Sequence, residues 1–369
     1  MKLTQKTIKI SLKIVISCAF FAILFSFVRG HELMGIFSRV DWLYLSLALL
    51  LTPLMLSVSC LKWKVILDCN GSAISFLKLL RIYLIGYFFS NLLPSNVGGD
   101  VVRSYYAGRL INNQAYAAVS ILVERVSGAI FLFVLVAVAP LFSPGLYGNP
   151  SIFIPACAGV FLTCATLWLW KVKQPLALPQ KIFSFIFFCF YKLADQLKWT
   201  GAGRYVEALE SWCKNIFRRL DRMRDATRFA AETLRNDRGY MLKITGLTVL
   251  FNIMTWINVY VAFRAFGSSP DFFIVCALVP VILSVGLVPV TLLGNIGYYE
   301  SVLVYYFLLA GIPGAETLAM GLLLRVKMLS MGVIGFLVYF FYKHSSQDEF
   351  DEIEAFQLKV DETNRTNIP

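Results

Sequence analysis

The sequence predicts an all-α integral membrane protein, built as a polytopic helical bundle. Of its 369 residues, 58% are hydrophobic and 15% are charged, whereas soluble domains are about 45–50% apolar and about 25% charged. The mean hydropathy is +0.69, and several apolar runs reach the ~20 residues that cross a bilayer as a helix. A transmembrane barrel would show weak segments of alternating hydrophobicity instead.

Six continuous apolar runs are predicted to cross the membrane as helices: 8–28, 42–61, 115–142, 151–170, 240–265 and 316–342. In the first, the apolar run from Ile14 to Val28 follows four lysines, as the apolar core of a signal peptide would. It ends in Val28-Arg29-Gly30, however, without the small-x-small pattern of a cleavage site. We therefore interpret it as a retained helix.

Two further apolar regions, 75–113 and 271–310, are broken in the middle. The first break contains Pro94, Gly98 and Gly99, and the second runs from Val288 to Glu300, with its tip near Pro289 to Gly297. Because proline removes a backbone donor and glycine loosens a helix, the chain is expected to unwind there. Unwound backbone at membrane depth must be buried by protein or reached by water.

Lysine and arginine in the connections predict the topology, because they accumulate on the cytoplasmic side. The N-terminus and the 62–81 connection are basic, and 171–239 carries fourteen lysines and arginines. The 143–150 and 266–271 connections carry none. The basic segments are therefore predicted to be cytoplasmic, and so are both termini.

This topology favours re-entrant hairpins over the two broken regions. Region 75–113 would enter from the cytoplasmic side and return there, and 271–310 would do the same from the opposite side. Two hairpins that enter from opposite faces form an inverted repeat, with a site near the midplane. Charge counting leaves the alternative open that each region is two ordinary spans, since an even number of crossings preserves the topology.

The chain is expected to be one transmembrane domain, 1–343, with a tail at 344–369. Within the domain, 171–239 is interpreted as a cytoplasmic basic segment with an amphipathic helix, which lies on anionic lipid or packs on the spans. The tail is acidic and is expected to be solvated and cytoplasmic. The net charge of +12 follows the predicted topology, so nucleic-acid binding is not expected.

Charged residues inside membrane spans are costly, so each is a functional hypothesis. They are Asp100, Arg103 and Arg109 after the first break, Glu124 and Arg125 in 115–142, Glu300 after the second break, and Arg325 and Lys327 in 316–342. The structural alternative is internal ion pairing, for example of Glu124 with Arg103 or Arg325. An arginine left for a ligand would suit a phosphate, which matches its planar fork.

The set expected to bind an anionic head group is Ser95, Gly98, Gly99, Asp100, Arg103, Glu124, Arg125, Asn295, Glu300 and Arg325. Backbone amides at Gly98 and Gly99 would add to the anion site. The pairs Tyr105-Tyr106 and Tyr298-Tyr299 flank the breaks and are typical of interfacial aromatics.

Enzymatic and metal chemistry find little support in the sequence. The two histidines, His31 and His344, are far apart, and the eight cysteines form no CxxC pair. There is no nucleophile with a nearby base pattern and no phosphate-binding loop. We expect neither a metal nor a cofactor, and no catalytic activity.

At three motifs the chain resembles the flippase-like transmembrane region of lysylphosphatidylglycerol synthases. They are Asn91 to Arg103, then Glu124-Arg125-x-x-Gly128, then Pro289-x-Thr291-x-x-Gly294-x-x-Gly297-x-x-Glu300. The resemblance covers about residues 8–342. In bifunctional members, a soluble domain transfers lysine to phosphatidylglycerol and the membrane region is held to move the product. This chain has no room for that domain, so aminoacyl transfer is not expected.

The resulting hypothesis is a lipid flippase of the bacterial inner membrane. Arg103, helped by Arg125 or Arg325, would hold an anionic head group while Asp100, Glu124 or Glu300 balances it or carries a coupling proton. One alternative is a non-transporting partner subunit for glycolipid or polyprenyl-phosphate enzymes, and another is an enzyme acting on a lipid phosphate. Membrane lipids are the expected partners, and homo-oligomerisation stays open.

Overall fold

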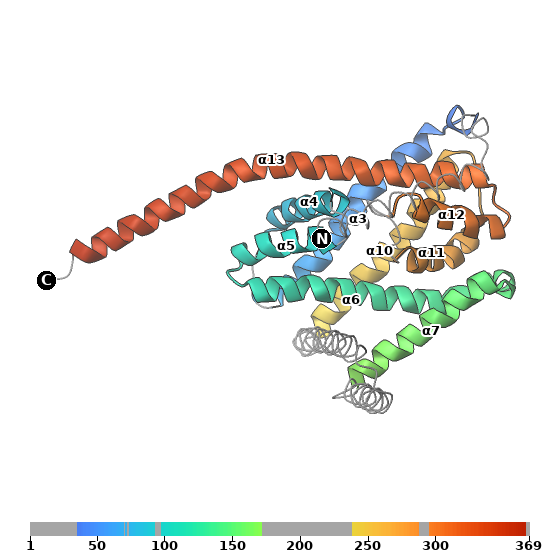
Figure 1. Ribbon diagram of the computed structural model, residues 1–369, viewed down its shortest axis with the longest axis horizontal. Helices are drawn as coiled ribbons and strands as arrows, with labels where there is room; N and C mark the ends of the chain where they lie inside the picture. The colour runs from blue at the N-terminus through green and yellow to red at the C-terminus, as the bar shows by residue number, and fades with distance from the viewer. Residues whose placement is uncertain are drawn as a thin grey trace, which may run out of the picture.

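The computed structural model of the protein describes residues 35–69, 71, 74–92, 97–171, 238–287 and 295–366 (Figure 1). Every element of regular secondary structure in these residues is helical. This confirms the predicted all-α class. The predicted span 8–28 lies outside the described residues, as do Ser95 and nearly all of the segment 171–239.

Four helices of the described part are long and apolar enough to cross a membrane. They are α3 (Trp42–Asp68), α6 (Gln114–Val138, continued by the 3-10 turn η1, Ala139–Leu141), α10 (Arg238–Ala265) and the first part of α13 (Gly314–Thr366). At most 28% of each apolar window is buried by protein, which is what lipid-covered helices require. Helix α7 (Pro150–Lys171) follows the short 3-10 turn η2 (Pro144–Gly148) and matches a fifth predicted run.

Helix α3 is longer than the sequence predicted. Asp41 caps its start by accepting from the amide of Leu43, and the helix continues past residue 61 to Asp68. Lys62 and Lys64, counted as charges of a cytoplasmic connection, are therefore helical residues. Lys64 pairs with Asp68 at 2.6 Å on the next turn, and Lys62 points into the bundle.

Each broken region forms a pair of short helices that pack against each other. The first pair is α4 (Phe76–Leu92) and α5 (Val97–Leu110), and the second is α11 (Phe272–Gly286) and α12 (Tyr298–Leu309). At 1.5 Å per residue these helices are ~18–26 Å long, which is shorter than the ~30 Å hydrocarbon core. The predicted breaks are thus present, and helix length favours hairpins over full spans.

The helix ends gather at two opposite ends of the bundle. At the first end, the Tyr116 hydroxyl donates to the carbonyl of Ile66 (2.7 Å), and the rings of Tyr106 and Tyr342 lie 5.5 Å apart. This joins the end of α3, the α5–α6 turn and the end of the apolar part of α13.

At the second end, the Asp41 amide donates to the Ala265 carbonyl (2.9 Å), and the Tyr306 hydroxyl donates to the Ser151 carbonyl (2.9 Å). These contacts join the start of α3 to the end of α10, and α12 to the start of α7. The α4–α5 hairpin therefore begins and ends at the first end, and the α11–α12 hairpin at the second.

The broken ends of the two hairpins meet the same stretch of α13. The side-chain amide of Asn91, at the end of α4, donates to the Met328 carbonyl (3.2 Å). Glu300, in the first turn of α12, accepts from Arg325 one turn earlier (2.8 Å). Both contacts lie near the middle of the apolar stretch Gly314–Tyr342. The convergence of the two breaks near mid-membrane, expected from the sequence, is present in the fold.

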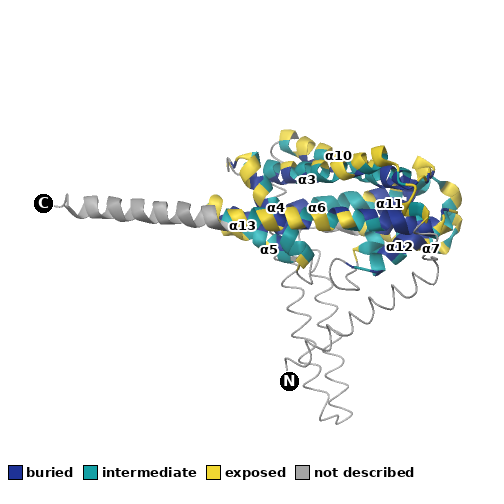
Figure 2. Cartoon of the chain, turned by 90° about the horizontal axis from the view of Figure 1, so that it is seen from above, coloured by how far each residue is buried: buried dark blue, intermediate teal, exposed yellow. Residues whose placement is uncertain are grey.

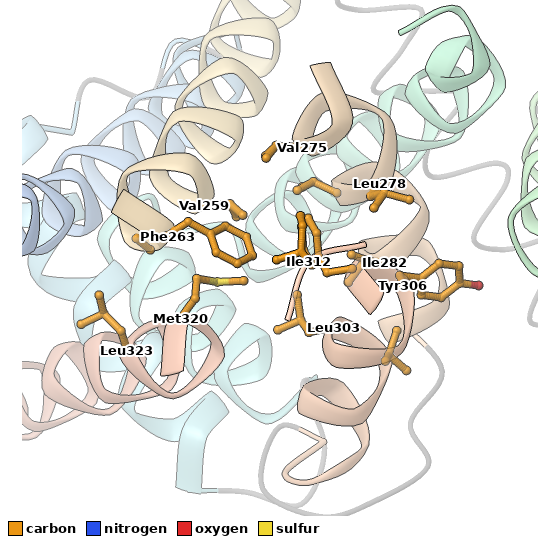
Figure 3. Packing of buried hydrophobic residues seen from close by; sticks show 14 of the residues in the cluster. Val259, Phe263, Val275, Leu278, Ile282, Leu303, Tyr306, Ile312, Met320 and Leu323 are labelled. Carbon is orange, nitrogen blue, oxygen red and sulfur yellow. The ribbon is translucent and has the colours of Figure 1, made fainter. Parts of the chain in front are cut away.

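Each of the two hairpins packs into a hydrophobic cluster. One cluster packs α10, α11, α12 and α13 together (Figure 3). In it, the rings of Phe263 and Phe307 meet edge to face at 4.9 Å. The other packs Trp63, Leu79 and Ile82 against α5 and α6. Figure 2 shows the densest burial on α11, whereas α3 and α10 carry exposed residues on their outer faces.

Helix α13 continues without a break to Thr366. The acidic segment 344–369 was expected to be a solvated tail. Through Thr366 it continues the last spanning helix, which projects beyond the rest of the bundle (Figure 1); its solvation stays a prediction. Nothing in a charge-rich composition prevents helix formation when an upstream helix already supplies the nucleus.

Candidate functional site

The first polar cluster consists of Asp100, Arg103, Glu124 and Arg125. Helix α5 supplies the first two and α6 the others, and the two helices pack side by side. Glu124 lies ~15 Å along the apolar stretch Gln114–Leu141, which is ~42 Å long, so the cluster lies well inside a ~30 Å hydrocarbon core. All four residues were predicted as site residues, and the fold brings them together.

Arg103 is the buried centre of this cluster. Its side chain is 3% exposed, and its guanidinium lies 2.5 Å from the Glu124 carboxylate and 3.5 Å from Asp100. The ring centroids of Trp63 and Tyr83 lie 4.2 and 4.0 Å from the guanidinium carbon, so the cation packs against two aromatic rings.

The sequence predicted that the guanidinium of Arg103 holds a head group, and this stays a prediction. In the structure, two aromatic rings and two carboxylates surround the guanidinium. Its Nε is buried without a hydrogen-bond partner among the described residues. Through its ion pair with Glu124, Arg103 joins α5 to α6.

The carboxylate and backbone carbonyl of Glu124 accept hydrogen bonds from three side chains. Its carboxylate accepts from Arg103 and from the Tyr83 hydroxyl at 3.1 Å, and the Lys62 ammonium donates to its backbone carbonyl at 3.3 Å. Of the two partners considered from the sequence, Arg103 is the one found. Sequence reasoning missed Lys62, Trp63 and Tyr83, because an ordinary spanning helix gives no signal for which face meets a distant charge.

Arg125 and Asp100 form the exposed half of the cluster. The Arg125 fork donates to both oxygens of Asp100, from Nε at 3.0 Å and from Nη2 at 2.9 Å. The Arg125 side chain is 55% exposed against 3% for Arg103. A cation this exposed well inside the hydrocarbon core needs a polar or anionic surrounding, because hydrocarbon would cost several kcal/mol.

Gly98 and Gly99 lie in the first turn of α5, and Gly99 serves packing. A Cβ on Gly99 would collide with the backbone of Gly86 and the hydroxyl of Ser90 on α4. A Cβ on Gly86 would in turn collide with the side chain of Arg103. The two glycines let α4 and α5 approach closely, and this approach places Arg103 against Tyr83.

The second polar cluster is Glu300, Arg325, Asn295 and Gly297. Glu300 is 2% exposed; one carboxylate oxygen accepts from the Gly297 amide (2.8 Å) and the other from Arg325 (2.8 Å). Gly297 has φ of +83°, which favours glycine. Glu300 thus caps α12 and ties it to α13 at once.

Asn295 has a structural place in the second break. It adopts a left-handed conformation (φ +62°), and its side-chain amide donates to the Gly286 carbonyl at the end of α11 (3.0 Å). Its predicted role as a head-group ligand stays a prediction, and the hydrogen bond links the start of α12 to the end of α11. Asparagine tolerates this backbone region better than most residues.

Lys327 is a further buried cation of α13. It is 3% exposed, and its ammonium donates to the side-chain carbonyl of Asn258 on α10. No acidic side chain pairs with it among the described residues. No group of three or more histidine, cysteine or acidic residues suited to a metal ion occurs in the described part of the chain.

We predict that Glu300→Ala lowers the free energy of unfolding by about 3 kcal/mol, because it removes a buried pair and a helix cap together. Denaturation in mixed micelles measures this. Glu316→Ala, in the first turn of α13 and only partly buried, is the control and should change stability by less than about 0.5 kcal/mol. Equal losses in the two variants would contradict the capping role.

The fold and the two clusters define the class of the protein. It is a polytopic helical membrane protein whose two broken hairpins meet at one spanning helix, with buried ion pairs well inside the hydrocarbon core. The chain belongs to the family of the lysylphosphatidylglycerol synthase transmembrane region, whose model matches residues 10–335. The resemblance seen in the three motifs is thereby confirmed.

Curated relatives extend over most of the chain. A UPF0104 membrane protein of Methanothermobacter thermautotrophicus is 22% identical over 83% of this chain and 87% of its own length. One of Pyrococcus horikoshii is 21% identical over 85% of this chain and 91% of its own. One of Methanocaldococcus jannaschii is 29% identical over 36% of this chain and 39% of its own. No solved structure gives a significant match.

Proposed function

We propose that the protein moves the anionic head group of a phospholipid, or of another anionic lipid, across the membrane. The observation that carries this proposal is the Arg125–Asp100 pair, an exposed and bidentate ion pair well inside the hydrocarbon core. A guanidinium held in this way is preorganised for a phosphate, whose oxygens match the same fork.

In this proposal the phosphate replaces Asp100 in the fork of Arg125. Asp100 keeps a second cation within reach, because Arg103 lies 3.5 Å away on the next turn of α5. The exchange therefore leaves no carboxylate unpaired in a low-dielectric environment, which would otherwise be costly. The acyl chains stay in lipid while the head group passes along the polar face of the α4–α5 hairpin.

The second polar cluster would keep the opposite hairpin fixed during this exchange. Glu300 and Arg325 join α12 to α13 at the same level at which Asn91 joins α4 to α13. A rearrangement that opens the site from the other side would have to release one of these two contacts. We further propose a bacterial cytoplasmic membrane, with both termini on the cytoplasmic side.

The proposal is tested by lipid movement in liposomes that contain only this protein. Head-group-labelled phosphatidylglycerol and lysyl-phosphatidylglycerol report the transfer, with an ion gradient supplied in parallel samples. We expect Arg125→Gln to reduce the rate at least about tenfold, since a bidentate charge contact is worth more than about 1.4 kcal/mol. Its stability should be nearly unchanged, because the side chain is 55% exposed.

Arg81→Gln is the matched control. Arg81 is an exposed arginine of the same hairpin that belongs to neither polar cluster, and its removal should leave the rate within twofold of wild type. Arg125→Lys keeps the charge and loses the fork, so it should give an intermediate rate. Folded wild-type protein that moves no lipid under any gradient would overturn the transport proposal and favour a partner-subunit role.

A further inference from the structure

A second feature that could bind lipid lies on the opposite face of α5 from the first polar cluster. It is a groove of about 270 Å³ between the α4–α5 hairpin and α13. Its lining residues are Phe89, Val101, Val102, Tyr105, Tyr106 and Tyr339. The wall is apolar and aromatic, with tyrosine hydroxyls as its main polar groups.

The groove is separate from the site proposed for transport. On a helix with 3.6 residues per turn, Asp100 and Arg103 share one face, and Val101, Val102 and Tyr105 lie on the other. The side chains that line the groove on α5 include strongly exposed ones, with Val101 62% and Tyr105 48% exposed. Helix α5 therefore presents a polar face to α6 and an aromatic face to the groove.

Interlocked rings form the wall of the groove. Phe89 and Tyr339 meet edge to face at 5.3 Å, and Tyr106 meets Tyr342 at 5.5 Å. These contacts tie α4 and α5 to α13, so the rings that line the groove are held by packing. An apolar wall held in this way binds an apolar chain with little ordering cost.

A cation stands at one end of the groove. The guanidinium of Arg109 lies 5.0 Å from the ring centroid of Tyr105, and the Arg109 side chain is exposed. Arg109 is in the last turn of α5, beside the turn that leads to α6 at the first end of the bundle. Val101, eight residues earlier, lies ~12 Å deeper at 1.5 Å per residue.

The arrangement matches a phospholipid that lies in one leaflet of the bilayer in its ordinary orientation. Arg109 is at the level of the membrane interface, and the aromatic slot runs from there toward the broken end of the hairpin. Basic groups between helices at an interface bind lipid phosphates, and tyrosines at this level suit the boundary between head groups and chains.

We infer that this groove is a binding site for an anionic phospholipid, with one acyl chain in the slot and the phosphate on Arg109. The inference does not rest on the proposed transport, because a resident lipid here would not need to cross the membrane. It would be a structural or regulatory lipid of the α4–α5 hairpin, held next to the residues that position Arg103 and Asp100.

Native mass spectrometry of the full-length protein tests the site, with phosphatidylglycerol and phosphatidylcholine of identical chains as the probes. We expect one phosphatidylglycerol to be retained about fivefold more tightly than phosphatidylcholine. Val102→Trp fills the slot and should abolish retention of both lipids. Arg109→Gln should keep the chain bound and reduce the preference for phosphatidylglycerol to less than twofold.

Val333→Trp and Arg81→Gln are the controls. Val333→Trp adds a ring to an exposed valine of α13, and Arg81→Gln removes another exposed arginine; neither residue lines the groove. Unchanged retention in Val102→Trp, or equal retention of the two lipids by wild type, would overturn the inference. If Val102→Trp fails to fold, Arg109→Gln alone decides, since its side chain is exposed. Inorganic phosphate should not displace the lipid, and displacement by it would show a simple anion site.

Discussion

Replacing Glu124 with alanine is expected to lower the free energy of unfolding by about 3–5 kcal/mol, the cost of breaking a buried ion pair from one side. Glu124 is 7% exposed and is the carboxylate nearest to the buried guanidinium of Arg103. Its loss would leave that cation with Asp100 at 3.5 Å and two aromatic rings. The Tyr83 hydroxyl would lose its acceptor as well.

Titration with sodium dodecyl sulfate in mixed micelles, followed by circular dichroism, measures this loss. The matched control is Arg125→Ala, which removes the exposed pair of the same cluster and should cost less than about 1 kcal/mol. The double variant Arg103→Met with Glu124→Leu should recover most of the stability, because apolar residues of similar size often replace a buried pair without loss. A double variant as unstable as Glu124→Ala would refute this account of the pair.

The second large effect is expected from Gly99→Ala, which should destabilise the protein by about 1–3 kcal/mol through overpacking. The new methyl group would collide with the Gly86 backbone and with Ser90, so α4 and α5 would have to separate. Because Arg103 packs against Gly86, the separation would also displace the first polar cluster. We therefore expect lipid movement to be lost together with stability.

Gly246→Ala is the control for this prediction. Gly246 also lies inside a helix, α10, but a Cβ there meets nothing within 4 Å. Alanine should therefore stabilise α10 slightly, by up to about 1 kcal/mol from helix propensity. The same assays apply to both variants. A Gly99→Ala protein as stable and active as wild type would show that the close contact between α4 and α5 is not required.

The charged residues of the site were visible in the sequence because their cost in a membrane marks them individually. Asp100, Glu124, Arg125, Glu300 and Arg325 all lie in the two polar clusters. The sequence did not show which of these charged residues are buried and which are exposed. Arg103 and Arg125 are both arginines in broken or spanning apolar segments, and only the packing makes one 3% and the other 55% exposed.

The ends of two helices were also not predicted from the sequence. The 42–61 run was predicted from its apolar length, with Lys62 counted in the connection that follows. The helix continues to Asp68, since Lys62 reaches the Glu124 carbonyl and Lys64 pairs with Asp68. The acidic composition after residue 343 gave no sign that α13 runs on to Thr366. Local composition does not show whether a charged side chain has a partner on another helix. It also does not show whether a helix that is already formed upstream will continue.

The sequence by itself determined the class of the protein, its apolar spans, its two breaks and the charges beside them. Each of these follows from the cost of polar groups in hydrocarbon, which acts on every residue separately. The tertiary structure alone decided that both breaks meet α13 near Arg325 and Met328, that Arg103 is buried, and that Arg125 is exposed. These depend on contacts between residues far apart in the chain, and one hydropathy pattern is compatible with many such pairings.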